Sequence, residues 1–470
     1  MKRRTFLKNS SALTIPGMVG GLPVAALRNS RLSTLINGDS DRILVLVQLI
    51  GGNDGLSTLI PIDQMDNLAQ VRSNMLIPES QLLNISDDLG FHPVMTGFKD
   101  LYQDSKMSII QSVAYPDQDR SHFRSSDIWN SGSAADEFIT NGWLGRYFEN
   151  RFANYPTDYP NADCPHPFAL TIGNSVSETC QGIGGNLSLA INDPTNLNQL
   201  SSPVNNALAD GCASENLDFL VTAIQQTNLY SEVITDIYED GNNLSSLYGD
   251  DNELAQSLKT VARLIAGGLQ TKVFVVSLGG FDTHANQIQG DSPIVGEHAD
   301  LLQTLSSAIH AFQDDLSLLG LEDRVLGMTY SEFGRRIRSN DSLGTDHGTA
   351  APLFIFGKCV RAGVNGNNPV IPPDAEIKEG VPMQYDFRSI YGSVLMDWFG
   401  VEESEVNGIF ANHDFQYISI ADSCNSVATK DQNENQAFEL NVWPNPFSKT
   451  FNVSFENRYD WIKILSLIHI

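Results

Sequence analysis

Residues 43–55 read ILVLVQLIGGNDG, an apolar run that leads into a glycine-rich turn carrying the carboxylate of Asp54. The run VFVVSL leads in the same way into GGFDTH with Asp282, and the run VLGMTY leads into SEFGR with Glu332. Short apolar runs rich in β-branched residues are typical of buried parallel strands. Because ligands bind beyond the carboxyl ends of such strands, we expect Asp54, Asp282 and Glu332 to converge on one edge of a sheet.

The stretches between these runs alternate between strand and helix patterns. We expect a strand at residues 107–113 and helices at about 93–101, 215–238, 252–269 and 295–319. Strand–helix–strand units of this length indicate a parallel sheet that is covered on both faces. The sequence therefore predicts an α/β fold, with a doubly wound, mostly parallel sheet and helices on both of its faces.

This domain is expected to span residues 41–422, with one interruption. Residues 154–215 are rich in Asn, Pro, Ser and Gly and carry three of the five cysteines. We interpret them as an insertion over one face of the domain, where a lid would lie. The cysteine content fits an oxidising compartment, and one or two disulfides are expected without a pairing that the sequence assigns.

Charge narrows the classes of partner. The 470-residue chain has 29 Lys and Arg against 56 Asp and Glu, a formal net charge of −27. This balance argues against nucleic acid as a partner, because phosphate binding needs a basic face. A high net negative charge does suit a secreted protein that must stay soluble.

The first residues resemble a targeting segment. KRRTFLK at residues 2–8 resembles a twin-arginine signal, and the mildly apolar stretch after it is interrupted by prolines and glycines. That stretch is too short and too broken for a stable membrane span. We expect a signal peptide at 1–26 and a linker at 27–40, with the twin-arginine export machinery as a partner. The protein would reach the periplasm and then be secreted or held at the cell surface.

The last residues differ in composition from the domain. After a polar linker at 423–436, the sequence WPNP resembles the start of the C-terminal sorting domain of type IX secretion. The candidate module, residues 437–464, is too short for a complete β-sandwich, so we interpret it as a truncated, partial β module. Residues 465–470 resemble a translated sequencing adapter and are expected to be an artefact.

Two short motifs carry candidate metal ligands. In GGFDTH, Asp282 and His284 stand two residues apart, and such residues at a strand end point the same way. In TDHG, Asp346 and His347 precede another apolar run, and an antiparallel strand there would bring them to the shared edge. Carboxylates gathered without matching bases need a cation or a proton between them. The alternative for each motif is a turn with a solvent-exposed histidine.

The segment Ser121-His122-Phe123-Arg124 supplies candidate catalytic groups. Ser121 could act as a nucleophile if a metal lowers its hydroxyl pKa, and Arg124 could hold an oxyanion in bidentate fashion. Ser121 could instead cap the helix that follows it. A G-x-S-x-G elbow is absent, which makes a serine-hydrolase triad the weaker interpretation. His298 lies on the stripe of its helix that faces the sheet, either as a packed core residue or close to the metal.

Together these motifs resemble the family named domain of unknown function (DUF) 1501. The resemblance covers roughly residues 41–420. It rests on the twin-arginine start and, in order, on GGNDGL, RSHF, NGWLGRY, GGFDTH, SEFGRR and GTDHG. That family is similar to the alkaline phosphatase/sulfatase-like superfamily, in which a doubly wound sheet holds one or two divalent metals beside a nucleophile.

The resemblance implies roles for individual residues. Asp54 and Glu332 resemble the ligands of one metal, and Asp282, His284 and His347 resemble the ligands of another. Ser121 stands in the place of the nucleophile. Further residues are expected just behind the metal ligands: His122, His298, Arg335 and Asp346. The sequence departs from the superfamily in two ways, because it has Ser-Glu-Phe-Gly where Asp-His is usual and no cysteine for a formylglycine mechanism.

These observations predict an exported, metal-dependent hydrolase of phosphate or sulfate esters. Zinc or manganese suits mixed carboxylate and imidazole ligands, with one or two ions. The metal would polarise the ester and activate Ser121 or a water molecule. The substrate would be a small anionic ester or a sulfated or phosphorylated glycan. The alternative is a non-catalytic surface or secreted binding protein that keeps the fold and a structural metal.

Overall fold

The computed structural model describes residues 41–197, 212–410 and 416–421, together with four short strands. Those strands pair as two antiparallel ladders: β1 (Met18–Val19) with β2 (Leu22–Pro23), and β17 (Asn441–Trp443) with β18 (Asn452–Ser454). Contacts divide the chain into two units, Met1–Cys424 and Asn425–Ile470. Apart from these strands, the signal, linker and sorting segments expected from the sequence lie outside the described residues.

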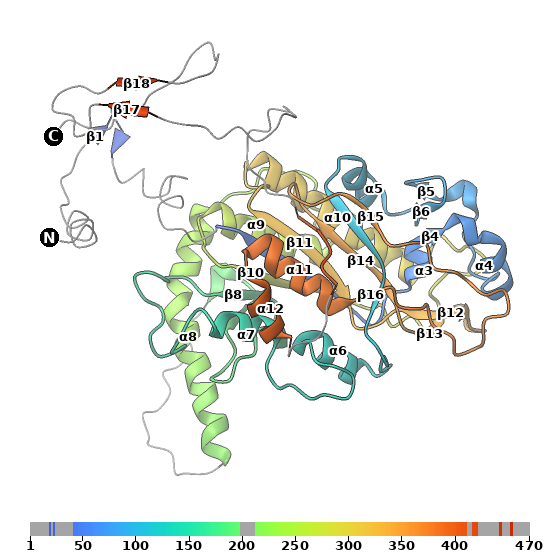
Figure 1. Cartoon of the computed structure of the whole chain (residues 1–470), viewed down its shortest axis with the longest axis horizontal. Helices are drawn as coiled ribbons and strands as arrows, with labels where there is room; N and C mark the ends of the chain where they lie inside the picture. Colours follow the sequence, from blue (N-terminus) through green and yellow to red (C-terminus); the bar gives the residue numbers. More distant parts are fainter. Residues whose placement is uncertain are drawn as a thin grey trace. The chain divides into compact units, whose positions relative to one another are not determined.

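A nine-stranded sheet forms the centre of the first unit, in the order β15-β7-β14-β11-β3-β10-β8-β9, with β16 beside β7 (Figure 1). Of these strands, β14 is antiparallel to both of its neighbours and the other pairs are parallel. The prediction of a mostly parallel sheet is confirmed. The strands are β3 (Ile43–Ile50), β7 (Met107–Ala114), β8 (Ala169–Ile172), β9 (Ser188–Ile191), β10 (Val273–Gly279), β11 (Val325–Ser331), β14 (Ala351–Phe356), β15 (Gly363–Asn365) and β16 (Tyr385–Asp386).

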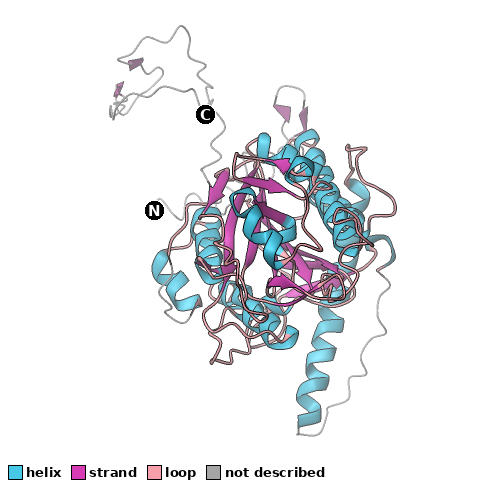
Figure 2. Cartoon of the chain, turned by 90° about the vertical axis from the view of Figure 1, so that its right-hand side faces the viewer, coloured by secondary structure: helices cyan, strands magenta, loops and turns pink. Residues whose placement is uncertain are grey.

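Both faces of this sheet are buried under helices, as Figure 2 shows. Alternate residues of β3 enter two different apolar clusters: Val45 and Val47 pack on one face, and Leu44 and Leu46 on the other. This period of two explains why the strand is apolar at every position except Gln48. The first face is covered by α5 (Thr96–Gln103), α8 (Cys212–Asp240), α9 (Glu253–Ala266) and α10 (Glu297–Leu318).

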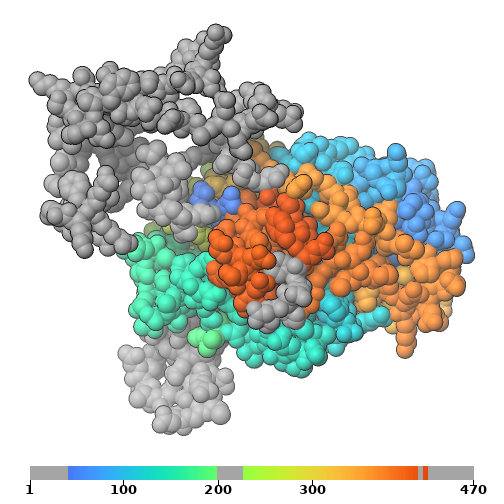
Figure 3. Space-filling model, viewed as in Figure 1, coloured from blue at the N-terminus to red at the C-terminus, as the bar shows by residue number. Residues whose placement is uncertain are grey.

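The second face is covered by four helices that come from two distant parts of the chain. In Figure 3 the orange-red segment that contains the two helices of residues 387–409 lies beside the teal segment that contains the two helices of residues 122–149. A stack of aromatic rings joins them, with Trp143 on Tyr391 at 4.4 Å between ring centroids. The helices are α6 (His122–Ser131), α7 (Trp143–Glu149), α11 (Phe387–Phe399) and α12 (Glu403–Ile409).

Small elements flank the edge of the sheet where the functional residues were expected. A three-stranded sheet has the order β4-β6-β5, and β12 pairs with β13 in an antiparallel hairpin. These elements are α3 (Gly55–Thr58), β4 (Leu59–Pro61), α4 (Met65–Val71), β5 (Leu83–Asn84), β6 (Leu89–Phe91), β12 (Arg335–Ser339) and β13 (Thr345–His347). The hairpin leads directly into β14, so it stands at the start of the one antiparallel strand.

Register brings the expected turns to one edge. Ile50 at the end of β3 pairs with Gly279 at the end of β10, and Leu49 pairs with Ser331 at the end of β11. The three turns that follow therefore open side by side. Since β14 runs the other way, its first residue, Ala351, lies near the end of β7, opposite Val113. The Asp346–His347 motif that precedes β14 thus reaches the same edge, as predicted.

The sequence led us to expect segment 154–215 as an insertion over one face of the domain. The structure differs, because part of this segment belongs to the central sheet. Strands β8 and β9 come from within it and extend the central sheet in parallel with β10. Each of these strands has only four residues and lies between polar turns, so the sequence shows no clear strand pattern there. Within the described residues Cys180 is buried and unpaired, while Cys359 is disulfide-bonded. Among the described helices, none combines the length and apolarity needed to cross a membrane.

His92, which follows β6, makes the stability of this domain depend on pH. It is buried, and burial lowers the pKa of its imidazole from 6.5 to about 4, against a hydrogen bond to the backbone of Pro293 that raises it. The neutral ring's contribution is therefore complete above pH 6.5 and is lost as the pH falls toward 4. We expect a loss of about 1.4 kcal/mol in unfolding free energy per pH unit within that window.

A matched variant isolates this effect from other titrating groups. Urea unfolding of the wild type and of His92→Gln at several pH values between 7 and 4 gives their difference in stability. That difference should shift against the wild type as the pH falls, because glutamine does not titrate. A difference that stays constant across the window would contradict the assignment.

Candidate metal centre

Close backbone packing fixes the turns around the site. Gly51 has φ +122, and a Cβ at this position would collide with the backbone nitrogen of Asp282. Glycine alone allows both the positive φ and this approach without strain. Gly344 plays a similar part, since a Cβ there would collide with the backbone of His284. The turn after β3, the turn after β10 and the β12–β13 hairpin therefore pack together with little freedom.

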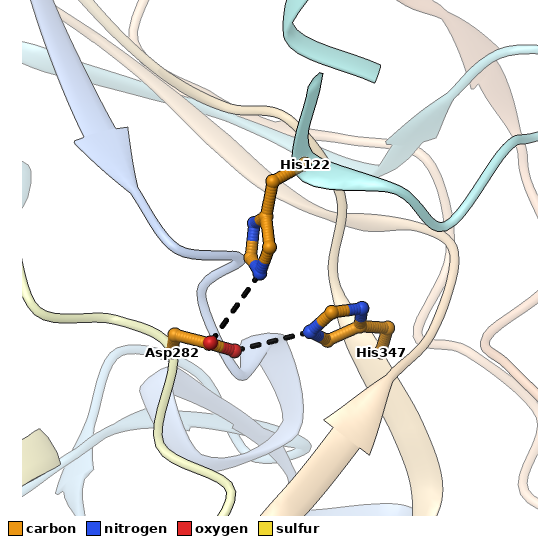
Figure 4. A group of neighbouring side chains, drawn as sticks. All are labelled: His122, Asp282 and His347. Atoms are coloured by element: carbon orange, nitrogen blue, oxygen red, sulfur yellow. Dashed lines mark hydrogen bonds and ion pairs between the residues drawn. The ribbon is translucent and has the colours of Figure 1, made fainter. Parts of the chain in front are cut away.

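Three imidazoles surround the carboxylate of Asp282. Its Oδ1 lies 3.0 Å from Nε2 of His284 and 3.1 Å from Nε2 of His347, and its Oδ2 lies 3.4 Å from Nε2 of His122. The Nε2 atoms of His284 and His347 are 2.9 Å apart. Figure 4 shows His122, from the start of α6, and His347, from the end of β13, both directed at Asp282.

The far side of each ring is held by a hydrogen-bond acceptor. Nδ1 of His122 lies 2.8 Å from Oε1 of Glu332, and Nδ1 of His284 lies 3.0 Å from Oδ1 of Asp346. Nδ1 of His347 lies 2.8 Å from the backbone carbonyl of Arg120. Because all three partners are acceptors, each Nδ1 carries the proton and each Nε2 presents a lone pair to the centre. This is the arrangement of metal-binding histidines oriented by a second hydrogen bond.

The centre fits a cation. Nε2 of His284, Nε2 of His347 and Oδ1 of Asp282 face one another as three acceptors about 3 Å apart, which requires a positive charge between them. Nε2 of His122 is buried and has no hydrogen-bond partner. Ligand atoms of His122, Asp282 and His347 lie within 4.8 Å of one another. These observations support a divalent-metal site.

The protonation states also suit a metal. Burial alone would raise the pKa of Asp282, but the hydrogen bond and the positive charge of Arg335 outweigh it and lower the pKa to about 2. Burial lowers the pKa of His347, even though hydrogen bonds to Arg120 and Asp282 raise it. A charged carboxylate and a neutral imidazole are the forms that bind metals. The side chains of Asp282 and His284 are 47 and 44 % exposed, so the centre is open to solvent.

Two predicted ligands do not join the centre. Asp54 is buried in an ion pair with Arg72 at 2.9 Å and also accepts hydrogen bonds from Ser57 and Gln287, both at 2.6 Å. Burial would raise the pKa of Asp54, but Arg72 and other neighbours lower it. Glu332 accepts from the N–H of Gly51 at 2.8 Å with the same oxygen that holds His122. The expected second metal site of Asp54 and Glu332 is therefore not assembled.

Of the residues expected behind the ligands, Arg335 and Asp346 contact the centre, whereas His298 does not. Arg335 is fully buried and donates to Oδ1 of Asp282 at 2.7 Å, and Asp346 orients His284 as described. His298 donates its Nε2–H to the amide oxygen of Asn53 at 2.9 Å, and it has no hydrogen bond to the imidazole cluster among the described residues. Burial lowers the pKa of His298 to about 3, although Asp54 raises it. His298 is thus a neutral residue of the protein interior.

The two predicted catalytic residues differ in position. Ser121 is the N-cap of α6, next to His122, and it is exposed with no side-chain capping bond. Arg124 pairs with Asp127 on the same helix. It also donates to the carbonyls of Ala134 and Ala135, at 3.1 and 3.0 Å. The guanidinium of Arg124 thus fastens the loop after α6, and no contact of it with the centre supports the expected role in holding an oxyanion.

Sequence reasoning missed two features of the site. His122 was expected behind the ligands, yet its ring faces Asp282 directly. Arg120, the first residue of the RSHF motif, was not singled out, yet its carbonyl orients His347. The motif itself was the available signal. Which of its side chains turns inward depends on where α6 begins, and the sequence alone did not fix that point.

The sequence profile of a family described as "Protein of unknown function (DUF1501)" matches residues 41–379. No curated protein matches the chain. Among solved structures, the chain is similar to the lipoteichoic acid synthase LtaP from Listeria monocytogenes, at 8 % identity and a TM-score of 0.34, covering 78 % of this chain and 74 % of that one.

Two other solved structures are similar at the same level. One is a protein in the alkaline phosphatase superfamily from Vibrio parahaemolyticus, at 9 % identity and a TM-score of 0.32, covering 76 % of this chain and 66 % of that one. The other is a Bacteroides thetaiotaomicron protein described with the metabolism of multiple glycosaminoglycans, at 7 % identity and a TM-score of 0.37, covering 88 and 85 %. Sequence identities and TM-scores this low carry no argument about the function of this chain. The site is therefore interpreted from its own side chains.

Divalent metal should stabilise the folded chain through this centre. A metal at one hundred times its dissociation constant adds about 2.7 kcal/mol to the free energy of unfolding. We expect Zn²⁺ to raise the melting temperature of the wild type and a chelator to reverse the rise. Asp282→Asn should abolish the response and the bound metal, whereas Asp341→Asn, at an exposed carboxylate in the β12–β13 turn, should keep both. Equal responses of the two variants would exclude the site.

Proposed function

The chain belongs to the DUF1501 family, and from this membership and the geometry of the centre we propose that it is a metal-dependent hydrolase of phosphate or sulfate esters. The observation that carries the proposal is the set of three imidazoles with their Nδ1 atoms held and their Nε2 atoms directed at Asp282. The motif order that resembles the alkaline phosphatase/sulfatase-like superfamily supports the same reaction class.

We propose one ion per chain, zinc or manganese. Three imidazoles and one carboxylate suit these metals better than calcium, which prefers oxygen ligands. Asp54, which a second ion would need, is already neutralised by Arg72. When bound, the ion supplies a Lewis acid that polarises the ester and stabilises developing charge.

The chain's own residues position the reacting groups. Ser121 has an exposed hydroxyl beside His122, at the N-terminal end of α6, where the helix dipole is positive. We propose that the oxygen of this hydroxyl bonds to the phosphorus or sulfur of the ester as the bond to the alcohol oxygen breaks, and that the alcohol leaves with the proton of the serine. Water then cleaves the serine ester, which restores the serine hydroxyl and releases phosphate or sulfate. Glu332 and Asp346 keep His122 and His284 in place during these steps.

The solvent exposure of the centre allows the substrate to have a large alcohol group. Because Asp282 and His284 are nearly half exposed, an ester on a large alcohol, such as a phosphorylated or sulfated glycan, can approach without entering a deep cavity. Export by the twin-arginine route and delivery outside the cell or to its surface belong to the same proposal. They rest on residues 1–26 and 437–464.

Turnover of simple esters tests the proposal. The full chain is loaded with Zn²⁺ or Mn²⁺ and assayed on aryl phosphates and aryl sulfates. Ser121→Ala should lower kcat by about 100-fold or more, as loss of a nucleophile does, with its metal content unchanged. Ser126→Ala, on the same helix, is the matched control and should keep full activity.

The outcomes separate the two functions that the sequence left open. A metal-loaded chain that turns over neither class of ester would contradict the hydrolase and favour a binding protein with a structural metal. Turnover that Ser121→Ala leaves intact would remove the serine from the mechanism and leave water as the nucleophile.

A further inference from the structure

The guanidinium of Arg120 lies against the backbone of His347, a candidate ligand of the metal centre. Its Nη1 donates to the backbone carbonyl of Lys378 at 2.8 Å and reaches the carbonyl of His347 at 3.5 Å. Among the described residues no carboxylate lies within ion-pair distance of it. The neighbouring arginines are paired, Arg335 with Asp282 at 2.7 Å and Arg336 with Asp346 at 2.8 Å. Arg120 therefore differs from them in lacking a negative partner.

A second guanidinium stands close to Arg120. Nε of Arg336 donates at 3.3 Å to the same carbonyl of His347 that Arg120 approaches. Like charges side by side next to a metal repel one another, so an anion bound between them would relieve the repulsion. Nε and Nη2 of Arg120 have no protein partner among the described residues and remain available to it.

The charges around the centre indicate which anion fits. Three guanidiniums, of Arg120, Arg335 and Arg336, offset the three carboxylates of the cluster, which are Asp282, Glu332 and Asp346. With neutral imidazoles, a divalent ion leaves the centre with about two positive charges. A phosphate monoester carries close to two negative charges above neutral pH, whereas a sulfate ester or a phosphate diester carries one.

We propose that Arg120 binds the non-bridging oxygens of the ester and that the substrates are phosphate monoesters rather than sulfate esters. The inference rests on the proposed function and narrows it. The planar guanidinium forms two parallel hydrogen bonds with such oxygens. Arg120 is thus the residue that takes the role which the sequence suggested for Arg124.

Binding of two matched anions tests the proposal without turnover. Phenylphosphonate is a dianion at pH 8 and benzenesulfonate a monoanion, both carry the same ring, and neither has an ester bond to cleave. Calorimetry of the zinc-loaded full chain should show at least about tenfold tighter binding of phenylphosphonate. Arg120→Gln should weaken that binding by about 10- to 100-fold, and Arg120→Lys should recover part of the loss.

Arg338→Ala is the control variant, since it removes the same charge from β12, where the side chain donates to the carbonyl of Ala375. It should bind both anions as the wild type does. Equal binding of the two anions by the wild type, or undiminished phosphonate binding by Arg120→Gln, would overturn the proposal. So would an equal loss in Arg338→Ala. Where Arg120→Gln does not fold, the wild-type preference and Arg120→Lys decide.

The readout also separates this proposal from the hydrolase itself. Absence of turnover on aryl esters, with a phosphonate preference that depends on Arg120, would leave the anion site standing and remove the hydrolase. Hydrolysis of aryl esters without such a preference would keep the hydrolase and remove the role of Arg120.

Discussion

The buried guanidinium of Arg335 joins the segments that build the metal centre. It donates to backbone carbonyls in the turns after β3 and β10 and to the carbonyl of Thr345 in β13, and it also reaches the carboxylate of Asp282. Removing such a charge from water costs several kcal/mol unless it is paired and its hydrogen bonds are satisfied. Each nitrogen of Arg335 has an acceptor, so the turns share one arrangement in which these bonds form together. The position of Asp282 follows from that arrangement.

Much of this arrangement could be predicted from the sequence, for a physical reason. Strands buried on both faces leave apolar runs that local patterns reveal, and β3, β10 and β11 are of this kind. Residues at their carboxyl ends must share an edge once the strands are parallel and in register. The spacing of Asp282 and His284 then placed two groups at the centre. His347 followed from assuming that β14 runs antiparallel, which it does.

The expectations that differ from the structure depend on tertiary contacts, which local sequence patterns do not reveal. Nothing near Asp54 in the sequence shows that Arg72 will pair with it in the interior, and this pair decides that the carboxylate turns away from the centre. Arg124 and Arg120 stand in one short segment, and the path of the chain into α6 determines which of them lies beside His347. Strands β8 and β9 were hidden because four residues are too few to set a pattern against polar turns.

The antiparallel direction of β14 in the central sheet has a consequence for when the protein can bind a metal at this centre. The histidines of the centre come from α6, from the turn after β10 and from the hairpin before β14, so they meet only after β14 has entered the sheet between β7 and β11. Bringing such distant segments together requires closure of long loops. An emerging or partly folded chain therefore has scattered imidazoles but no site. Binding of a metal at this centre would therefore follow the docking of β14, and the ion would come from the compartment in which the chain folds.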